Sequence, residues 1–137
     1  MRNILKRLSV TSVAAVAIFA TTTVTNASAA SGGAACSVTG ASGSLTFTNW
    51  TATRVDISGW VKDTAADGYP VAIRFVSIDG GTGWVHEWPW HTNSRGNGST
   101  LNFTTYAAPS GDRLSYIGAQ VAVMNGGKIV RSCTNYA

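Results

Sequence analysis

The segment His86-Glu87-Trp88-Pro89-Trp90-His91 holds the residues of this chain that come nearest to a catalytic or metal-binding motif. It approaches the zinc-protease pattern H-E-x-x-H, in which two histidines on one helical face bind zinc and the glutamate acts as the base. Here one additional residue separates the histidines, and Pro89 prevents a regular helix. In an extended strand, the odd separation of His86 and His91 would place them on opposite faces. We therefore expect no metal site and no cofactor.

Other catalytic arrangements have little support in the sequence. Glu87 is the sole glutamate, and no segment resembles the serine nucleophile elbow. A glycosidase needs two carboxylates at a defined distance in space, which the sequence alone does not reveal. We therefore expect a protein that is not an enzyme and has no catalytic residues. A small secreted hydrolase that uses Glu87 and His86 is the alternative.

Four aspartates lie in turn-like segments, beside glycine or close to it. Carboxylate oxygens in such loops are suitable ligands for calcium. Aspartate before glycine is also ordinary turn chemistry, and no EF-hand spacing is present. We favour the structural role for all four: Asp63, Asp67, Asp79 and Asp112.

The aromatic side chains of residues 84–90 offer a stronger indication of function. Trp84, His86, Trp88 and Trp90 alternate with other residues, so a continuous strand would project all four from one face over about 20 Å. An exposed row of this kind could stack on the successive sugar rings of a polysaccharide. The simpler interpretation, which we favour, places this face in the core, because tryptophan is usually largely buried. Four such rings overfill a narrow core, so Trp90 at least is expected to reach its rim.

Trp60 is a separate candidate for an exposed aromatic residue. In the segment 54–62, Val55, Ile57 and Val61 alternate with it. These three apolar residues would face the core of a sheet protein, which leaves Trp60 on the opposite face.

The two cysteines, Cys36 and Cys133, bracket nearly the whole chain that follows an export signal. Residues 1–30 read as a cleaved signal peptide, with a basic start, an apolar stretch too short to span a bilayer and small residues at 27–30. An even number of cysteines behind such a signal predicts a disulfide. Lipid attachment at Cys36 is disfavoured, because Gly33 stands where a leucine-like residue is expected. We expect a secreted, extracellular protein with no membrane association after cleavage.

The charge of the predicted mature chain excludes one class of partner. The whole chain has a net charge of +4, but Arg2, Lys6 and Arg7 belong to the predicted signal. Seven basic residues then face six acidic ones, a net charge of +1 with no basic cluster. Nucleic-acid binding loses its usual electrostatic basis.

The remaining residues, 31–137, are enough for one domain with its own core. Short runs rich in Val, Ile, Thr and aromatic residues alternate with turn residues, which indicates an all-β fold. Asn125-Gly126-Gly127 predicts a hairpin between the last two strands. The sequence therefore predicts a single antiparallel β-sandwich, immunoglobulin-like or similar, whose termini are tied by one disulfide. The expected strands, about seven, are 44–48, 54–62, 71–78, 84–90, 100–107, 114–124 and 128–133.

Part of the chain resembles small secreted all-β proteins of high-GC Gram-positive bacteria. The resemblance rests on Trp50-Thr51-Ala52-Thr53, on Gly59-Trp60-Val61 and on the loop Lys62-Asp63-Thr64-Ala65-Ala66-Asp67-Gly68, with Cys133 as a looser match. Many such proteins have a cysteine soon after this loop, where Tyr69-Pro70 stands here. The resemblance implies extracellular location and β architecture, and it implies neither an activity nor a second disulfide.

The sequence thus predicts a secreted, monomeric, non-catalytic extracellular binding protein. One specific form of this hypothesis is a carbohydrate- or cell-wall-binding module that uses Trp84, Trp88, Trp90 and Trp60. A protease-inhibitor-like protein that presents the loop 93–99 is the alternative.

Overall fold

The computed structural model describes residues 29–137, which form nine β-strands and no helix. Of the predicted signal peptide, only residues 29 and 30 fall within this range. None of the described residues belongs to a helix that could cross a membrane. The strands are β1 Ala30–Val38, β2 Ala41–Trp50, β3 Val55–Asp63, β4 Val71–Ile78, β5 Val85–Glu87, β6 His91–Asn93, β7 Thr100–Ala107, β8 Tyr116–Asn125 and β9 Lys128–Tyr136.

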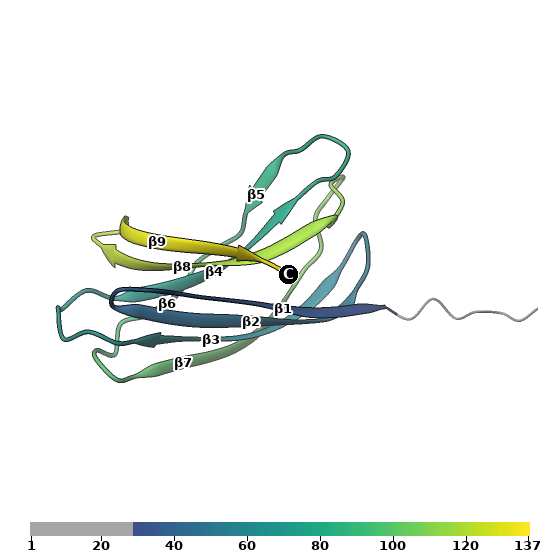
Figure 1. Ribbon diagram of the computed structural model, residues 1–137. Helices are drawn as coiled ribbons and strands as arrows, with labels where there is room; N and C mark the ends of the chain where they lie inside the picture. Colours follow the sequence, from purple (N-terminus) through teal and green to yellow (C-terminus); the bar gives the residue numbers. More distant parts are fainter. Residues whose placement is uncertain (1–28) are drawn as a thin grey trace, which may run out of the picture.

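The strands form two antiparallel sheets that pack face to face, which confirms the predicted β-sandwich (Figure 1). Sheet A has the order β1-β2-β3-β7, and sheet B has the order β5-β4-β8-β9 with β6 also paired to β4. One lateral side of the sandwich is bounded by β1 and β9. The other side is bounded by β7 and by the two short strands β5 and β6.

The buried side chains between the sheets come from alternate positions of the long strands. Val55, Ile57 and Val61 of β3 face Ile73 and Phe75 of β4 in one cluster. This alternation is the one that the sequence pattern predicts, because residues of a strand point to opposite faces in turn. A smaller cluster on the outer side of sheet B contains Ala72, Ala122 and Met124, with Trp90 packed against it.

The first strand, β1, has no counterpart among the expected strands. Its segment is rich in Ser, Gly and Ala, which carry little β-propensity and no clear apolar alternation. The strand forms because it pairs along β2, from Val38 opposite Ala41 to Ala30 opposite Trp50. Tertiary pairing, and not local sequence preference, therefore determines this element.

The expected strand 84–90 is wrong as a continuous element. The structure has two three-residue strands, β5 and β6, which pair with opposite halves of β4. Glu87 lies opposite Val76 and His91 lies opposite Ile73, so three residues of this segment, 88–90, face only two of β4. One extra residue makes a bulge, at which the side-chain alternation reverses. Nine strands replace the expected seven because of β1 and this interruption.

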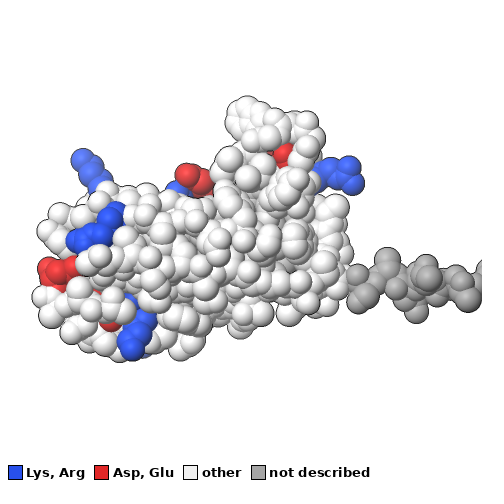
Figure 2. All heavy atoms as spheres, viewed as in Figure 1, with Lys and Arg blue, Asp and Glu red and all other residues white. Residues whose placement is uncertain are grey.

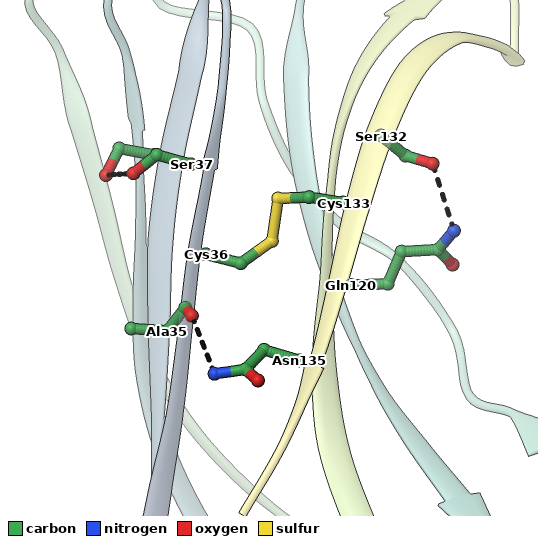
Figure 3. The surroundings of a disulfide bond; sticks show 8 residues. Ala35, Cys36, Ser37, Gln120, Ser132, Cys133 and Asn135 are labelled. Carbon is green, nitrogen blue, oxygen red and sulfur yellow. Dashed lines mark hydrogen bonds between the residues drawn. A yellow bond between two sulfur atoms is a disulfide. The ribbon is translucent and has the colours of Figure 1, made fainter.

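A disulfide between Cys36 of β1 and Cys133 of β9 joins the two sheets, as predicted (Figure 3). Both cysteines pack against the main core. Asn135 Nδ2 donates a hydrogen bond of 3.1 Å to Ala35 O across the same gap. The bond therefore closes the lateral side that β1 and β9 bound, and its presence is consistent with an oxidising extracellular environment.

The predicted hairpin between β8 and β9 is also present. Asn125 pairs with Lys128, and Gly126 and Gly127 form the two-residue turn with φ angles of 57° and 78°. Two positive φ values in succession suit glycine, which has no Cβ to clash with the backbone.

The hairpin from β4 to β5 projects beyond the body of the sandwich, at the top of Figure 1. Charged side chains gather near this projection and at the opposite end of the molecule (Figure 2). A long surface between them carries few charges in this view.

Candidate functional site

The outer face of sheet A carries mainly uncharged hydroxyl and amide side chains. Because Val55, Ile57 and Val61 are buried, the alternate residues of β3 point outward. The same alternation turns one side of β2 and β7 outward. The residues of this outer face, which we call the hydroxyl face, are Ser42, Ser44, Thr46, Thr48, Asp56, Ser58, Trp60, Lys62, Thr100, Asn102, Thr104 and Tyr106.

Two large aromatic residues stand on the hydroxyl face. Trp60 of β3 is 37% exposed, as its alternation predicts, and Tyr106 of β7 is 58% exposed. Trp60 lies opposite Asn102, and Tyr106 lies four residues further along β7, about 13 Å at 3.3 Å per residue. The two rings therefore mark the ends of a strip that follows β3 and β7.

Two shallow depressions occupy the strip between these rings. One is lined by Trp60, Asn102 and Thr46, and the other by Tyr106, Asp56 and Thr48. Both are lined by Ser58 and Thr104, so they adjoin at the centre of the strip. The strip thus has an aromatic ring at each end, Trp60 and Tyr106, and hydroxyl groups that can form hydrogen bonds lie between the two rings.

A hydrogen-bonded group organises the Tyr106 end. The guanidinium of Arg54 lies over the Tyr106 ring at 4.1 Å and forms an ion pair of 3.0 Å with Asp56. Asn49 Nδ2 donates to the other Asp56 oxygen at 2.9 Å. The hydrogen bond from Asn49, and then that from Arg54, lowers the pKa of Asp56 below its usual value. The carboxylate therefore stays ionised and holds Arg54 against the ring.

The expectation that Trp84, Trp88 and Trp90 share one face is wrong. Trp88 packs against the main core with its ring 5.6 Å from Phe75, and its Nε1 donates to Ser77 Oγ at 3.0 Å. Trp90 packs on the outer side of sheet B, where the guanidinium of Arg74 lies 4.2 Å from its ring. The bulge at 88–90 causes the reversal, since one extra residue shifts the alternation.

Trp84 lies apart from both clusters, just before β5 on the projecting hairpin. It is 75% exposed, the most exposed large apolar side chain of the described residues. No continuous ladder of aromatic rings exists in this segment. The sequence favoured burial of all four side chains in the core. Among them, only Trp88 packs against the main core, and its side chain is only half-buried.

The two histidines of the same segment also depart from the expected geometry. His86 pairs with Ser77 and His91 pairs with Ile73, both of which face the inside of sheet B. The bulge therefore brings these histidines to the same side, although their separation is odd. His91 stacks on Phe103 with ring centroids 3.8 Å apart, and its burial lowers its pKa. His86 Nδ1 lies 4.0 Å from Asp112 Oδ2.

The aspartates of the turns bond mainly to backbone groups. Asp79 accepts hydrogen bonds from the N–H groups of Arg113 at 2.8 Å, Thr82 at 2.9 Å and Gly81 at 2.7 Å. These bonds, that of Arg113 most strongly, lower the pKa of Asp79. Asp67 likewise accepts from Tyr69 N–H. Among residues 29–137, no three His, Cys, Asp or Glu side chains are grouped so that they could hold a metal ion.

The loop 93–99 is braced from within. The buried Asn93 side chain donates to Ser99 O at 3.0 Å and accepts from Arg95 N–H at 3.1 Å. Arg95 in turn donates from Nη2 to Thr100 O at 2.6 Å. One guanidinium N–H group of Arg95, the one cation of this loop, is therefore bonded within the protein.

Protein-family models, curated protein sequences and solved structures give no match to this chain. Tyr106 is the site residue that the sequence analysis did not identify. Its signal was present, since Asn102, Thr104 and Tyr106 alternate in the segment 100–107 with Leu101 and Phe103.

Proposed function

We propose that this chain is a secreted, non-catalytic binding protein that binds polysaccharide on its hydroxyl face. The observation that carries this proposal is the placement of Trp60 and Tyr106 on one face of sheet A, with Ser58 and Thr104 between them. Ring faces pack on the C–H groups of sugars, and hydroxyls exchange hydrogen bonds with sugar hydroxyls. The site differs from that expected from the sequence, because only Trp60 is retained.

The charge and composition of the face favour a neutral glycan over other ligands. Lys62 and Asp56 are its charged residues, and Asp56 forms an ion pair with the neighbouring Arg54. The centre of the strip is uncharged and polar, whereas the centre of a protein interface is usually apolar. The face also lacks the basic cluster that a nucleic acid requires.

Binding to insoluble polysaccharides tests this proposal. Purified protein is mixed with peptidoglycan, chitin and cellulose, and the bound fraction is measured across protein concentrations. We expect saturable binding to at least one of them, weakened about tenfold or more in Trp60→Ala, a loss of about 1.4 kcal/mol.

The matched control is Trp84→Ala, which removes a tryptophan that is more exposed but lies away from the hydroxyl face. This variant is expected to bind like the wild type. Equal losses in both variants, or no binding of the wild type to any of the three polymers, would contradict the proposal.

A further inference from the structure

A cleft of about 500 Å³ lies at the end of the sandwich opposite the projecting hairpin. The loop 64–70, which joins β3 to β4, forms one wall, and the loop 94–99, which joins β6 to β7, forms the other. The first wall is the Asp-Thr-Ala-Ala-Asp-Gly segment that the sequence analysis singled out. The hydroxyl face makes no use of this segment.

Hydrogen bonds fix the two walls against each other. Gly98 N–H donates to Asp63 O at 2.8 Å, and Asp63 N–H donates to Ser99 O at 3.1 Å. The first wall is also tied to the turn after β1, where Thr64 N–H donates to Gly40 O at 3.0 Å. A ligand would therefore meet a formed cleft, and little conformational entropy would be lost on binding.

The carboxylate of Asp63 is the polar group at the floor of this cleft. Asp63 is only 2% exposed, and its Oδ1 accepts a hydrogen bond from Ala65 N–H at 3.1 Å. Its Oδ2 has no hydrogen-bond partner among residues 29–137. Every fully buried side-chain oxygen of the described residues has a partner, so Oδ2 retains some accessible surface, and Asp63 lines this cleft. A nearly buried carboxylate oxygen in this position requires a donor from a ligand or water.

The opposite wall supplies donors. Arg95 is held by its bond to Thr100 O, which leaves its other guanidinium N–H groups free, and it forms no ion pair within the described part of the chain. Asn97 adds an amide, and the half-buried ring of Tyr69 adds an aromatic surface. The cleft thus combines an acceptor on its floor with donors on its wall.

We propose that this cleft binds a single sugar residue, such as the end or a branch of a glycan chain. A simple cation would be repelled by Arg95, and a simple anion would be repelled by Asp63. The two opposite charges therefore favour a ligand that donates hydrogen bonds at one position and accepts them at another. A sugar ring does both through its hydroxyls, which would donate to Asp63 and accept from Arg95 and Asn97. The choice of a sugar among such ligands rests on the proposed glycan-binding function, whereas the site itself is separate from the hydroxyl face.

Titration of ¹⁵N-labelled protein with glucose and, separately, N-acetylglucosamine tests the cleft by NMR. We expect saturable shifts of the amide signals of Ala65, Gly68 and Gly96 with at least one of these sugars at millimolar concentrations. Arg95→Ala and Asn97→Ala, both at exposed positions, should each weaken this binding about tenfold by removing a hydrogen bond. Asp63→Asn, with its fold verified by the same spectra, should weaken it further.

The experiments distinguish a failure of the cleft proposal from a failure of the proposal for the hydroxyl face. Trp60→Ala should lose polysaccharide binding and keep the sugar-induced shifts of the cleft. Absence of saturable shifts with both sugars overturns the cleft proposal, as do shifts that persist unchanged in Arg95→Ala. Shifts of these amides by glycine alone would overturn it in favour of an amino-acid ligand.

Discussion

At the scale of single residues, Gly59 is a position where packing leaves no room for a side chain. A Cβ atom built there would lie 2.5 Å from Leu45 Cδ2 and 2.9 Å from Phe103 Cζ. These two side chains come from the strands on either side of β3 and meet over the glycine. The absence of a side chain at 59 therefore allows two large residues to fill the core.

We expect Gly59→Ala to destabilise the protein by about 1–3 kcal/mol, the usual cost of overpacking. Urea unfolding followed by tryptophan fluorescence measures this loss. Ser58→Ala, on the outward side of the same strand, is the control and should unfold within about 0.5 kcal/mol of the wild type. A Gly59→Ala protein as stable as the control would contradict this account of the core.

His91 gives the molecule a dependence on pH. Burial lowers the pKa of His91, so the folded state binds a proton less readily than the unfolded state, whose histidine titrates near about pH 6.5. As the pH falls through that value, the unfolded chain takes up the proton first, and stability is lost until the pH passes the folded pKa.

The Tm of the wild type should therefore fall more steeply than that of His91→Phe between about pH 7.5 and about pH 5. Phenylalanine keeps an aromatic ring against Phe103, whose ring centroid lies 3.8 Å from that of His91. Thermal unfolding followed by circular dichroism at a series of pH values provides the comparison. Parallel slopes in the two proteins would show that His91 is not responsible.

At the scale of the elements, a polar chain crosses the outer side of sheet B and positions Trp90. Arg74 of β4 pairs with Glu87 of β5 at 3.0 Å, and its Nε donates to Gln120 of β8 at 2.7 Å. Gln120 in turn donates to Ser132 of β9 at 3.3 Å. Because Arg74 also lies over Trp90, the bulged segment 88–90 is attached to β4 by more than its backbone.

We expect Arg74→Lys to lower the free energy of unfolding by about 1–2 kcal/mol, since lysine has neither the planar fork nor the same stacking surface. Arg54→Lys is the matched control, because its ion pair with Asp56 is exposed and such pairs contribute about 1 kcal/mol or less. Chemical denaturation of both variants decides the point. A smaller effect at Arg74 than at Arg54 would contradict the structural role of the polar chain.

The strands show what the sequence could and could not predict. The buried alternation of β3, the hairpin at Gly126-Gly127 and the exposure of Trp60 follow from local patterns. Strand β1 could not be predicted in this way, since its small residues are ordered by pairing with β2. The prediction of an aromatic row in 84–90 was wrong because side-chain alternation assumes a regular strand, and one extra residue within 88–90 breaks that alternation.

At the scale of the whole molecule, the disulfide joins the first and last strands across a separation of 97 residues. It bridges the lateral side of the sandwich where no backbone pairing links the two sheets. In the chain-entropy model, closing a loop of this length removes about 4.7 kcal/mol of unfolded-state entropy. This is a large part of the roughly 5–15 kcal/mol that stabilises a typical domain.

The double variant Cys36→Ser with Cys133→Ser should therefore lose about 4 kcal/mol or more of stability, and reduction of the wild type should have a similar effect. Urea unfolding of the oxidised wild type, the reduced wild type and the variant gives the comparison. A loss below about 1 kcal/mol in both would contradict the view that this bond holds the sheets together.

The whole molecule also separates its two candidate sites. The hydroxyl face lies on the outside of sheet A, whereas the cleft lies between loops at one end of the sandwich. The projecting hairpin with Trp84 belongs to neither. This separation allows binding of glycan on the hydroxyl face to be tested without any mutation.

The most direct measurement is the response of the five tryptophan indole N–H signals to a soluble fragment of the bound polysaccharide, in ¹⁵N-labelled protein. We expect a saturable shift of the Trp60 signal, with the Trp84 and Trp90 signals unchanged. A shift of Trp84 or Trp90 without one of Trp60 would contradict it.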